Sequence, residues 1–233
     1  MSGLGYGYGF DPTFLILIPA MLLSMWASAR VNSTFKQYSQ IQAHGNVTAD
    51  GVAKMLLTLN GMGNMPVNHV SGNLTDHYDP TKRTLNLSDP VYGSRSIASI
   101  GVAAHEAGHA IQHNENYSPL IIRNKIVPAV NIATQASQFL FIIGLLVANF
   151  ALVDFGIILF SASLAFHLIT LPVEINASSR ALKLLEQTNT LNSNELAGAR
   201  KVLTAAAWTY IAAALTSVLT LVRLILIRNS RRR

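Results

Sequence analysis

The chain has no cysteine and few charged residues, and both absences restrict what it can be. Without cysteine there are no disulfides and no thiolate ligands, so a bound metal ion must be held by His, Asp or Glu side chains. Only 12% of the residues are charged, against about 25% in a typical soluble domain, while half are hydrophobic. This composition favours a protein that lies largely in a membrane.

Four stretches of the sequence are apolar and come close to or exceed the roughly 20 residues that a bilayer-crossing helix needs. They are Thr13 to Ala29, Val127 to Val153, Phe155 to Val173 and Val202 to Val222. A cleaved signal peptide explains the first stretch poorly, because the Gly/Tyr-rich segment before it, Gly3 to Phe10, has no basic residue. We predict a mainly α integral membrane protein with about four transmembrane helices, the second and third forming a hairpin with its turn at 149–154.

The net charge of +6 does not point to nucleic acid, because basic residues gather directly after the fourth apolar stretch. They are Arg223, Arg228, Arg231, Arg232 and Arg233. Basic residues that flank an apolar stretch anchor a helix at a membrane surface. We therefore expect a lipid bilayer as partner and no nucleic acid.

Residues 105–109 read HEAGH, an H-E-x-x-H motif inside the apolar run Ile97 to Ile111. On a helix, residues four apart lie on one face, so His105 and His109 can bind one metal ion from the same side. Glu106 then lies beside them, where it can act as general base toward the attacking water. This pattern is the signature of a zinc-dependent peptidase.

The alternative is a helix that merely carries two histidines. The run around the motif, for which Ser94 is the expected N-cap, is apolar nearly all round, which is typical of a buried helix. Buried His and Glu side chains need polar partners, and a metal ion supplies them. The surroundings of the motif therefore favour a metal site.

The largest polar block, residues 30–126, is predicted to hold a small α+β catalytic region. Thr48 is the expected N-cap of a helix over Ala49 to Leu59, and short strands are expected at Val67 to Val70 and Thr84 to Leu87. The alternation of polar and apolar residues in the last segment suits an edge strand, to which a peptide substrate could add. A purely structural hairpin is equally open.

Composition divides the chain into five segments. They are 1–29 (N-terminal segment and first transmembrane helix), 30–126 (catalytic region with the motif helix), 127–173 (transmembrane hairpin), 174–201 (polar, largely helical region) and 202–233 (fourth transmembrane helix and basic tail).

A catalytic zinc ion usually has three protein ligands, so a third ligand is needed. His113 lies eight residues beyond His105, about 12 Å along a helix, and cannot share the ion. His167 lies inside the third apolar stretch, where a functional role and a neutral interhelical contact are both open. Glu174 follows that stretch, and two spans separate it from His109, so both residues return to the same membrane face. We expect Glu174 to be the third ligand; the alternative is an interfacial carboxylate paired with Arg180 or Arg200.

Several longer segments now point to a family. The sequence resembles the YugP-type neutral zinc metallopeptidases over nearly the whole chain from about residue 30, in the segments 74–80 (LTDHYDP), 87–88, 96–112 (SIASIGVAAHEAGHAIQ), 171–181 (LPVEINASSRA) and 199–214. The resemblance implies a membrane-bound zinc peptidase in which His105, His109 and Glu174 bind one zinc ion and Glu106 is the general base.

The layout also resembles the HtpX and CAAX prenyl protease group, in which an Asp shortly after the Glu ligand orients a histidine ligand. Ser178 stands in place of that Asp, and Asn176 or Asp76 could substitute for it. For the donor that stabilises the oxyanion, Tyr78, His77 and Arg180 remain open.

Two other functions compete with this one. In a site-2-type intramembrane protease the motif lies within a span, but its apolar run is only about 15 residues here, short for a span. A membrane scaffold, chaperone or transporter with a structural metal site would need a fourth protein ligand.

The basic residues near the spans favour a cytoplasmic active site in a multi-pass protein of the plasma membrane. With 30–126 and 174–201 inside, the cytoplasm receives Arg30, Lys36, Arg123, Lys125, Arg180, Lys183, Arg200 and Lys201. The arginine-rich tail would then lie outside, against the same rule. The expected partner is a membrane-associated polypeptide substrate; the sequence favours no oligomeric state.

Overall fold

The computed structural model describes residues 11–232, most of which are helical. Gly3 to Phe10 and Arg233 lie outside the described residues. In chain order the elements are a 3-10 turn (Pro12–Leu17), α1 (Ile18–Ser39), α2 (Ala49–Leu59), β1 (Val67–Val70), β2 (His77–Asp79), β3 (Thr84–Ser88), α3 (Ile97–Asn114), α4 (Ser118–Leu146), α5 (Phe150–Gln187) and α6 (Ser193–Arg232).

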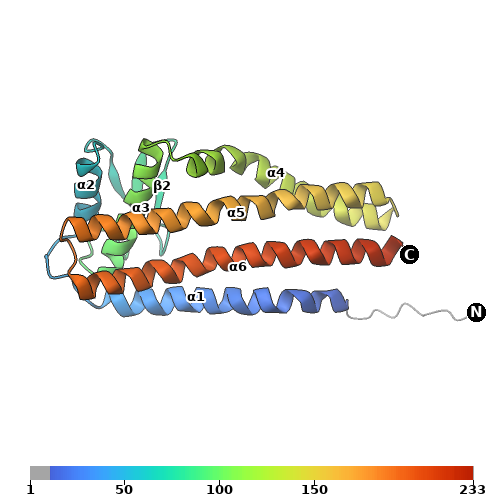
Figure 1. The fold of residues 1–233 in the computed structure, drawn as a ribbon, viewed down its shortest axis with the longest axis horizontal. Coiled ribbons are helices and arrows are strands. Elements are labelled where there is room, and N and C mark those ends of the chain that lie inside the picture. Colours follow the sequence, from blue (N-terminus) through green and yellow to red (C-terminus); the bar gives the residue numbers. More distant parts are fainter. Residues whose placement is uncertain (1–10, 233) are drawn as a thin grey trace, which may run out of the picture.

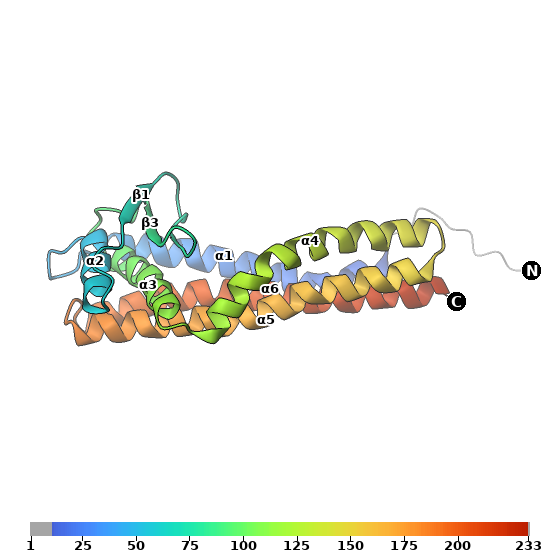
Figure 2. The ribbon, with the colours of Figure 1, turned by 90° about the horizontal axis from the view of Figure 1, so that it is seen from above.

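The long helices form an elongated bundle with a small α+β region at one end. Helices α1, α5 and α6 run side by side along the long axis, and α4 packs against α5 (Figures 1 and 2). Helices α2 and α3 and the sheet lie at one end, and both ends of the described chain lie at the other (Figure 1). The predicted fold class is confirmed.

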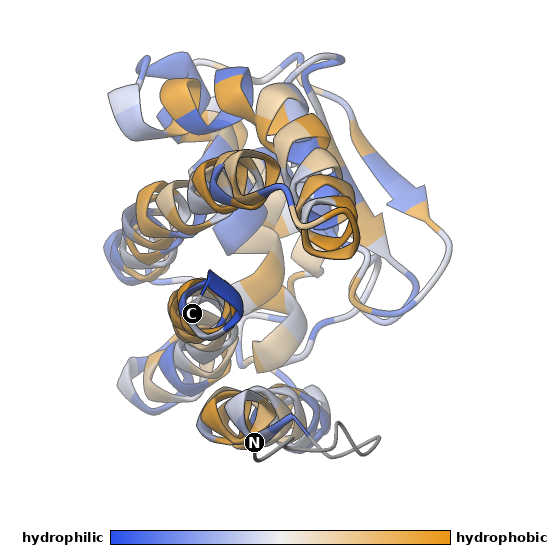
Figure 3. Cartoon of the chain, turned by 90° about the vertical axis from the view of Figure 1, so that its right-hand side faces the viewer, coloured by the Kyte–Doolittle hydropathy of each residue, from blue (hydrophilic) through white to orange (hydrophobic). Residues whose placement is uncertain are grey.

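Within residues 11–232, four segments are long and apolar enough to cross a membrane: Pro12–Ser39, Ser118–Leu146, Phe150–Gln187 and Ser193–Arg232. Seen along the long axis, hydrophobic residues lie on the outside of these helices as well as between them (Figure 3). Ile132, Phe139 and Leu146 of α4, for example, are more than two-thirds exposed. Large apolar side chains facing outward over a whole bundle suit contact with lipid rather than water.

The helices are longer than the apolar stretches that predicted them. Helix α4 begins at Ser118 and changes direction along its length (Figure 2). Pro128, inside this helix, removes a backbone hydrogen bond, which is a common cause of a bend. Helix α5 continues through Pro172 to Gln187. The predicted turn at 149–154 is too long, because Asn149 already caps α5 through its side-chain oxygen, which accepts from the backbone of residues 151 and 152.

The small sheet differs from the predicted hairpin in its strand order, which is β1-β3-β2. Strand β3 is parallel to β1 and antiparallel to β2, so it is the central strand, and the prediction of an edge strand at 84–87 is wrong. The polar residue that suggested an exposed face, Asn86, is buried and bonds the side chains of Asn68 and His77. The α2 prediction is confirmed, with the Thr48 side chain accepting from Gly51.

Helix α3 is buried as predicted and is capped two residues later than predicted. Its N-cap is Ser96, whose hydroxyl accepts from the backbone of Ser99, while Ser94 donates to the Ser96 hydroxyl. From Ile97 to Gln112 every side chain is buried except Val102 and His105. Almost the whole helix is therefore core, and its position is determined by packing on all sides.

A glycine lets α3 approach α5 closely. A Cβ atom at Gly108 would lie 2.7 Å from the backbone oxygen of Ala177 on α5, which is closer than real Cβ contacts allow. This contact lies between the two histidines of the motif and the helix that carries Glu174. The glycine of the motif thus decides how near the third carboxylate comes to the imidazoles.

Candidate metal centre

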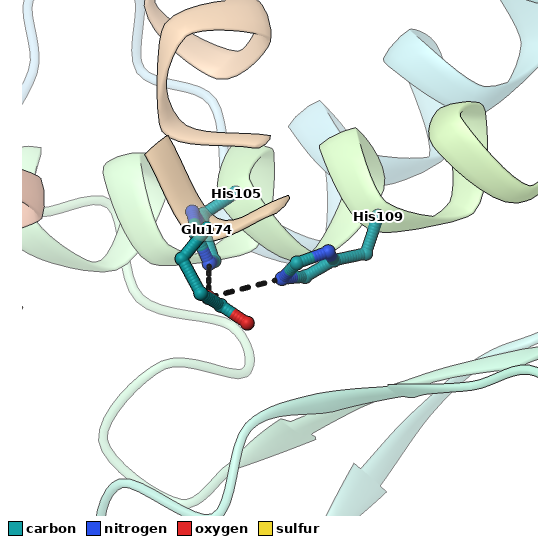
Figure 4. A group of neighbouring side chains, drawn as sticks. All are labelled: His105, His109 and Glu174. Carbon is teal, nitrogen blue, oxygen red and sulfur yellow. Dashed lines mark ion pairs between the residues drawn. The ribbon is translucent and has the colours of Figure 1, made fainter. Parts of the chain in front are cut away.

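Three side chains from two helices meet beside this contact. His105 and His109 project from one face of α3, and Glu174 reaches them from α5 (Figure 4). The Oε2 atom of Glu174 lies 3.3 Å from Nε2 of His105 and 3.4 Å from Nε2 of His109. Across residues 11–232 this is the one group of three His, Asp or Glu ligand atoms that lies together, all within 4.8 Å of one another.

The carboxylate of Glu174 itself indicates that a cation fits here. Its Oε2 atom is buried and has no hydrogen-bond partner among the described residues, while Oε1 accepts from Nη1 of Arg123 at 2.9 Å. A buried carboxylate oxygen without a partner costs free energy. A metal ion bound by Oε2 and the two imidazole nitrogens would remove that cost.

The outer nitrogens of both imidazoles are held by uncharged side chains. Nδ1 of His109 lies 3.0 Å from Oε1 of Gln112, and Nδ1 of His105 lies 3.0 Å from the hydroxyl of Ser178. Because an amide oxygen only accepts, Nδ1 of His109 carries the proton and its Nε2 keeps a free lone pair toward the cluster. Imidazoles oriented in this way are ready for a metal ion.

Ser178 therefore makes the hydrogen bond that orients a histidine of the cluster, a role that the sequence analysis left open between Asn176 and Asp76. Asn176 acts one step further out: its side-chain oxygen accepts from Nε2 of Gln112 at 2.9 Å. Asp76 instead accepts from the backbone and the hydroxyl of Ser88 and holds β3. Of Ser178, Asn176 and Asp76, only Ser178 is hydrogen-bonded to a histidine of the cluster.

Glu106 is buried next to the cluster, in a cavity of about 230 Å³ that it shares with all three residues. The backbone N–H of Tyr78 on β2 donates to its Oε2 at 2.9 Å. Burial raises the pKa of Glu106 to about 7, although the neighbouring His105 lowers it. A carboxyl group that titrates near neutral pH can both accept and release a proton at physiological pH.

The three candidates for the oxyanion donor lie in different places. His77 and Tyr78 line the cavity, but the hydroxyl of Tyr78 is bonded to Nδ1 of His113 at 2.7 Å. Arg180 points elsewhere, to Glu115 at 2.6 Å. His113 is thus a partner of Tyr78 and no ligand, as expected from its distance along the helix.

The sequence analysis did not place Arg123 or Tyr210 in the cavity wall. Arg123, on the first turns of α4, is the ion-pair partner of Glu174, where the alternative interpretation expected Arg180 or Arg200. Tyr210, on α6, lines the cavity opposite the motif helix. A tyrosine within an apolar span is a weak signal, and neither position follows from spacing, because packing of separate helices brings them to the site.

In the part of the chain that the structure describes, the fold and the cluster define a helical protein with four segments able to cross a membrane and one candidate site for a metal ion. The chain belongs to the family described as "Putative neutral zinc metallopeptidase", whose model matches residues 13–229. It is 49% identical over 212 residues to "Putative membrane protease YugP" of Bacillus subtilis (strain 168), covering 91% of this chain and 94% of that protein. No solved structure matches the chain. The predicted family is confirmed, and its name implies zinc.

Proposed function

We propose that the protein is a membrane-bound zinc endopeptidase that hydrolyses peptide bonds of membrane or membrane-proximal polypeptides. The observation that carries the proposal is the partnerless Oε2 of Glu174 between the inner nitrogens of His105 and His109, with Glu106 in the same cavity. These three ligands would hold one zinc ion, which supplies Lewis acidity toward the scissile carbonyl and the attacking water.

The chain's own residues account for the proton transfers. Glu106 would take the proton from the attacking water and return it to the leaving amine, a general acid–base role worth about 10²–10⁴-fold in rate. The N–H of Tyr78 fixes the direction of the carboxylate. Because Tyr78 belongs to β2, the same contact ties the edge of the sheet to the catalytic carboxylate.

The free edge of β2 offers a place for a peptide. Its other edge pairs with β3, and Tyr78 donates from the free edge toward Glu106. A substrate that pairs along this edge would pass the metal site in an extended conformation, a common mode of peptide recognition. In this proposal the substrate pairs with β2, because the strand at 84–87, which was expected to be the edge strand, is the central one.

The structure favours this function over its two rivals. Only three ligand groups meet among the described residues, whereas a structural zinc site is usually closed by four. Helix α3 is buried in the α+β region and is not among the four candidate spans, unlike the motif helix of a site-2-type protease.

We further propose that the site faces the cytoplasm from the plasma membrane. Arg123, Arg180, Lys183, Arg200 and Lys201 all lie on the parts of α4, α5 and α6 near the site, which suits the cytoplasmic side.

The test compares membranes containing wild-type protein with membranes containing Glu106→Gln. Both proteins are expected to bind one zinc ion, and peptide fragments should appear only with the wild type. Glu115→Gln is the matched control, because Glu115 ends the same helix and pairs with Arg180 away from the cavity. A Glu106→Gln protein that binds zinc and still cleaves at the wild-type rate would rule out the mechanism.

A further inference from the structure

A second, apolar cavity of about 270 Å³ adjoins the candidate metal centre. It is lined by α1, α3, α6 and the loop before β2, and the three helices contact one another at that end of the bundle (Figure 1). Asp76, His105, Glu106 and Tyr210 line both this cavity and the one that contains the cluster. The two cavities therefore share a wall at the residues proposed to carry the chemistry.

Apart from Thr209, the rest of the second cavity is lined by apolar residues. Val31 and Phe35 of α1 face Val202 and Ala206 of α6 across it. No charged residue lines it apart from Asp76, His105 and Glu106 on the shared wall. A side chain that enters it would meet hydrocarbon on most sides and the metal site on one.

Helix α3 shows that the cavity is a real opening in the core. From Ile97 to Gln112 the only side chains that are not buried are His105 and Val102, one turn before it. His105 opens toward the cluster, and Val102 lines the second cavity. An otherwise fully buried helix thus leaves one metal-ligand candidate and one apolar side chain partly open, three residues apart on one face.

We propose that this cavity is the specificity pocket of the peptidase and takes a large apolar side chain, such as that of Leu or Phe, from a residue flanking the scissile bond. The inference rests on the proposed peptidase function. About 150 Å³ already holds a benzene ring, so the pocket has room for such a side chain. Continuity with the metal cavity places that side chain within one residue of the bond that is cleaved.

The pocket also narrows the substrate class. Its walls come from α1 and α6, both of which are candidate membrane spans. Segments that cross the bilayer are predominantly apolar, so such residues are common where a polypeptide enters or leaves it. The preferred substrates are then apolar, membrane-proximal segments rather than charged ones.

The first experiment determines cleavage preference with full-length, zinc-loaded protein in lipid nanodiscs and a randomised peptide library, with products sequenced by mass spectrometry. Leu, Ile, Met or Phe should be enriched at one position beside the cleaved bond. In matched peptides, Leu there should give a kcat/KM at least about 10-fold above Ala, since even a single methylene in an apolar pocket is worth about 10-fold.

Three substitutions connect that preference with the pocket. Ala206→Phe fills it and should bring the Leu-to-Ala ratio of kcat/KM close to one. Ala207→Phe is the control: the next residue of α6 lines a groove with α5 and does not line the pocket. Because Ser178 also lines that groove, the overall rate can change, but the Leu-to-Ala ratio should stay as in the wild type. Val102→Ala enlarges the pocket and should increase cleavage of peptides with Trp at the selected position.

The outcomes separate the pocket from the function on which it rests. Cleavage without an apolar preference would overturn the proposed pocket and leave the peptidase function intact. An apolar preference that Ala206→Phe and Ala207→Phe change equally would do the same. If no library peptide is cleaved faster by wild type than by Glu106→Gln, the peptidase function itself fails. In that case, binding of fluorescent Leu and Ala peptides to zinc-loaded Glu106→Gln, with and without Ala206→Phe, decides about the pocket: a Leu preference that Ala206→Phe abolishes supports it, and equal binding overturns it.

Discussion

Each histidine of the cluster is oriented by an uncharged side chain, and the partner of His105 holds its imidazole less firmly than the partner of His109 does. A serine hydroxyl contacts Nδ1 of His105, whereas Gln112, which holds His109, is itself fixed by the backbone oxygen of Val173. In the protease group that the layout resembles, a carboxylate stands where this chain has Ser178. A hydroxyl makes the same hydrogen bond with less electrostatic support for the imidazole.

We predict that Ser178→Ala weakens zinc binding about 10- to 100-fold, the range found when a partner that orients a metal ligand is removed. Ser179→Ala is the control, because Ser179 is the exposed neighbour on the same helix. Zinc affinity measured by competition with a chelator of known strength provides the test. Equal affinities of the two variants would show that the Ser178 contact does not orient His105.

The raised pKa of Glu106 predicts a pH-dependent change of stability in the zinc-free protein. Because burial raises the pKa from 4.5 to about 7, the ionised side chain lowers the free energy of unfolding. This penalty is absent below about pH 4.5, grows up to about pH 7 and is complete above it. At 1.36 kcal/mol per pKa unit it reaches about 3 kcal/mol.

Zinc-free Glu106→Gln should therefore be more stable than wild type at pH 8, with the difference shrinking toward pH 4.5. Thermal unfolding in detergent across this pH range measures it. Bound zinc should reduce the difference, because a cation beside the carboxylate stabilises its ionised form. A stability difference that does not depend on pH would contradict the buried, neutral Glu106.

The sequence predicts residues of the site where local geometry alone brings them together. The i, i+4 spacing on one helix suffices for His105 and His109, and counting membrane crossings suffices for the side on which Glu174 lies. Arg123, Gln112 and the apolar pocket could not be predicted, because they depend on how α3 packs against α4, α5 and α6.

At the scale of elements, the approach of α3 to α5 is the most demanding contact. Gly108 lies against the backbone of Ala177, and backbone cannot move aside as a flexible side chain can. Gly101, on the same helix, faces the side chain of Ala199 on α6, and a Cβ atom there would lie 3.3 Å from the Ala199 Cβ. The two glycines are equally buried and differ mainly in what they meet.

We predict that Gly108→Ala destabilises the protein by about 1–3 kcal/mol, the usual cost of overpacking a core, and also weakens zinc binding. Gly101→Ala should cost less, because a gain of up to about 1 kcal/mol in helix propensity offsets a milder contact. Thermal unfolding with and without zinc separates the two effects. The same loss of zinc affinity in both variants would show that the α3–α5 distance does not control the site.

Helix ends were predicted less well than helix existence, for a physical reason. Hydropathy marks where a helix leaves the bilayer, and the backbone hydrogen bonds of α5 continue well beyond that point, through Glu174 to Gln187. Caps were predicted where one side chain decides, as for Thr48 on α2. They were misplaced where two serines compete, as at Ser94 and Ser96, because only the packed structure decides which hydroxyl meets the first turn.

On the scale of the whole molecule, the length of the bundle places the site at a membrane surface. Helix α6 has 40 residues and is about 60 Å long, twice the roughly 30 Å of a bilayer core. Glu174 lies about 36 Å along α5 from Phe150, at 1.5 Å per residue. If the α4–α5 turn lies at the far surface, the metal centre lies just beyond the near one.

The far end explains part of the arginine-rich tail. Arg223 binds Asp11 at 2.8 Å, and Arg228 binds both carboxylate oxygens of Asp154 at 2.7 and 2.8 Å. These pairs tie α6 to the start of the chain and to the first turns of α5. Arg223 and Arg228 therefore have a structural role in holding the helices together. Their position after the fourth span is for that reason weaker evidence against a cytoplasmic site.

We predict that residues 81 and 230 lie on opposite sides of the membrane, with residue 81 inside. Thr81, in the turn between β2 and β3, and Ser230, near the end of α6, are both exposed. Because the chain has no cysteine, Thr81→Cys and Ser230→Cys each introduce a single thiol with no background. In intact cells a membrane-impermeant maleimide should label Ser230→Cys alone, and in permeabilised cells it should label both variants.

Labelling of Thr81→Cys alone in intact cells would mean that the orientation is reversed while the four-span bundle is retained. Labelling of both variants in intact cells would instead contradict the four-span arrangement, because the three spans between residues 81 and 230 must leave these residues on opposite surfaces.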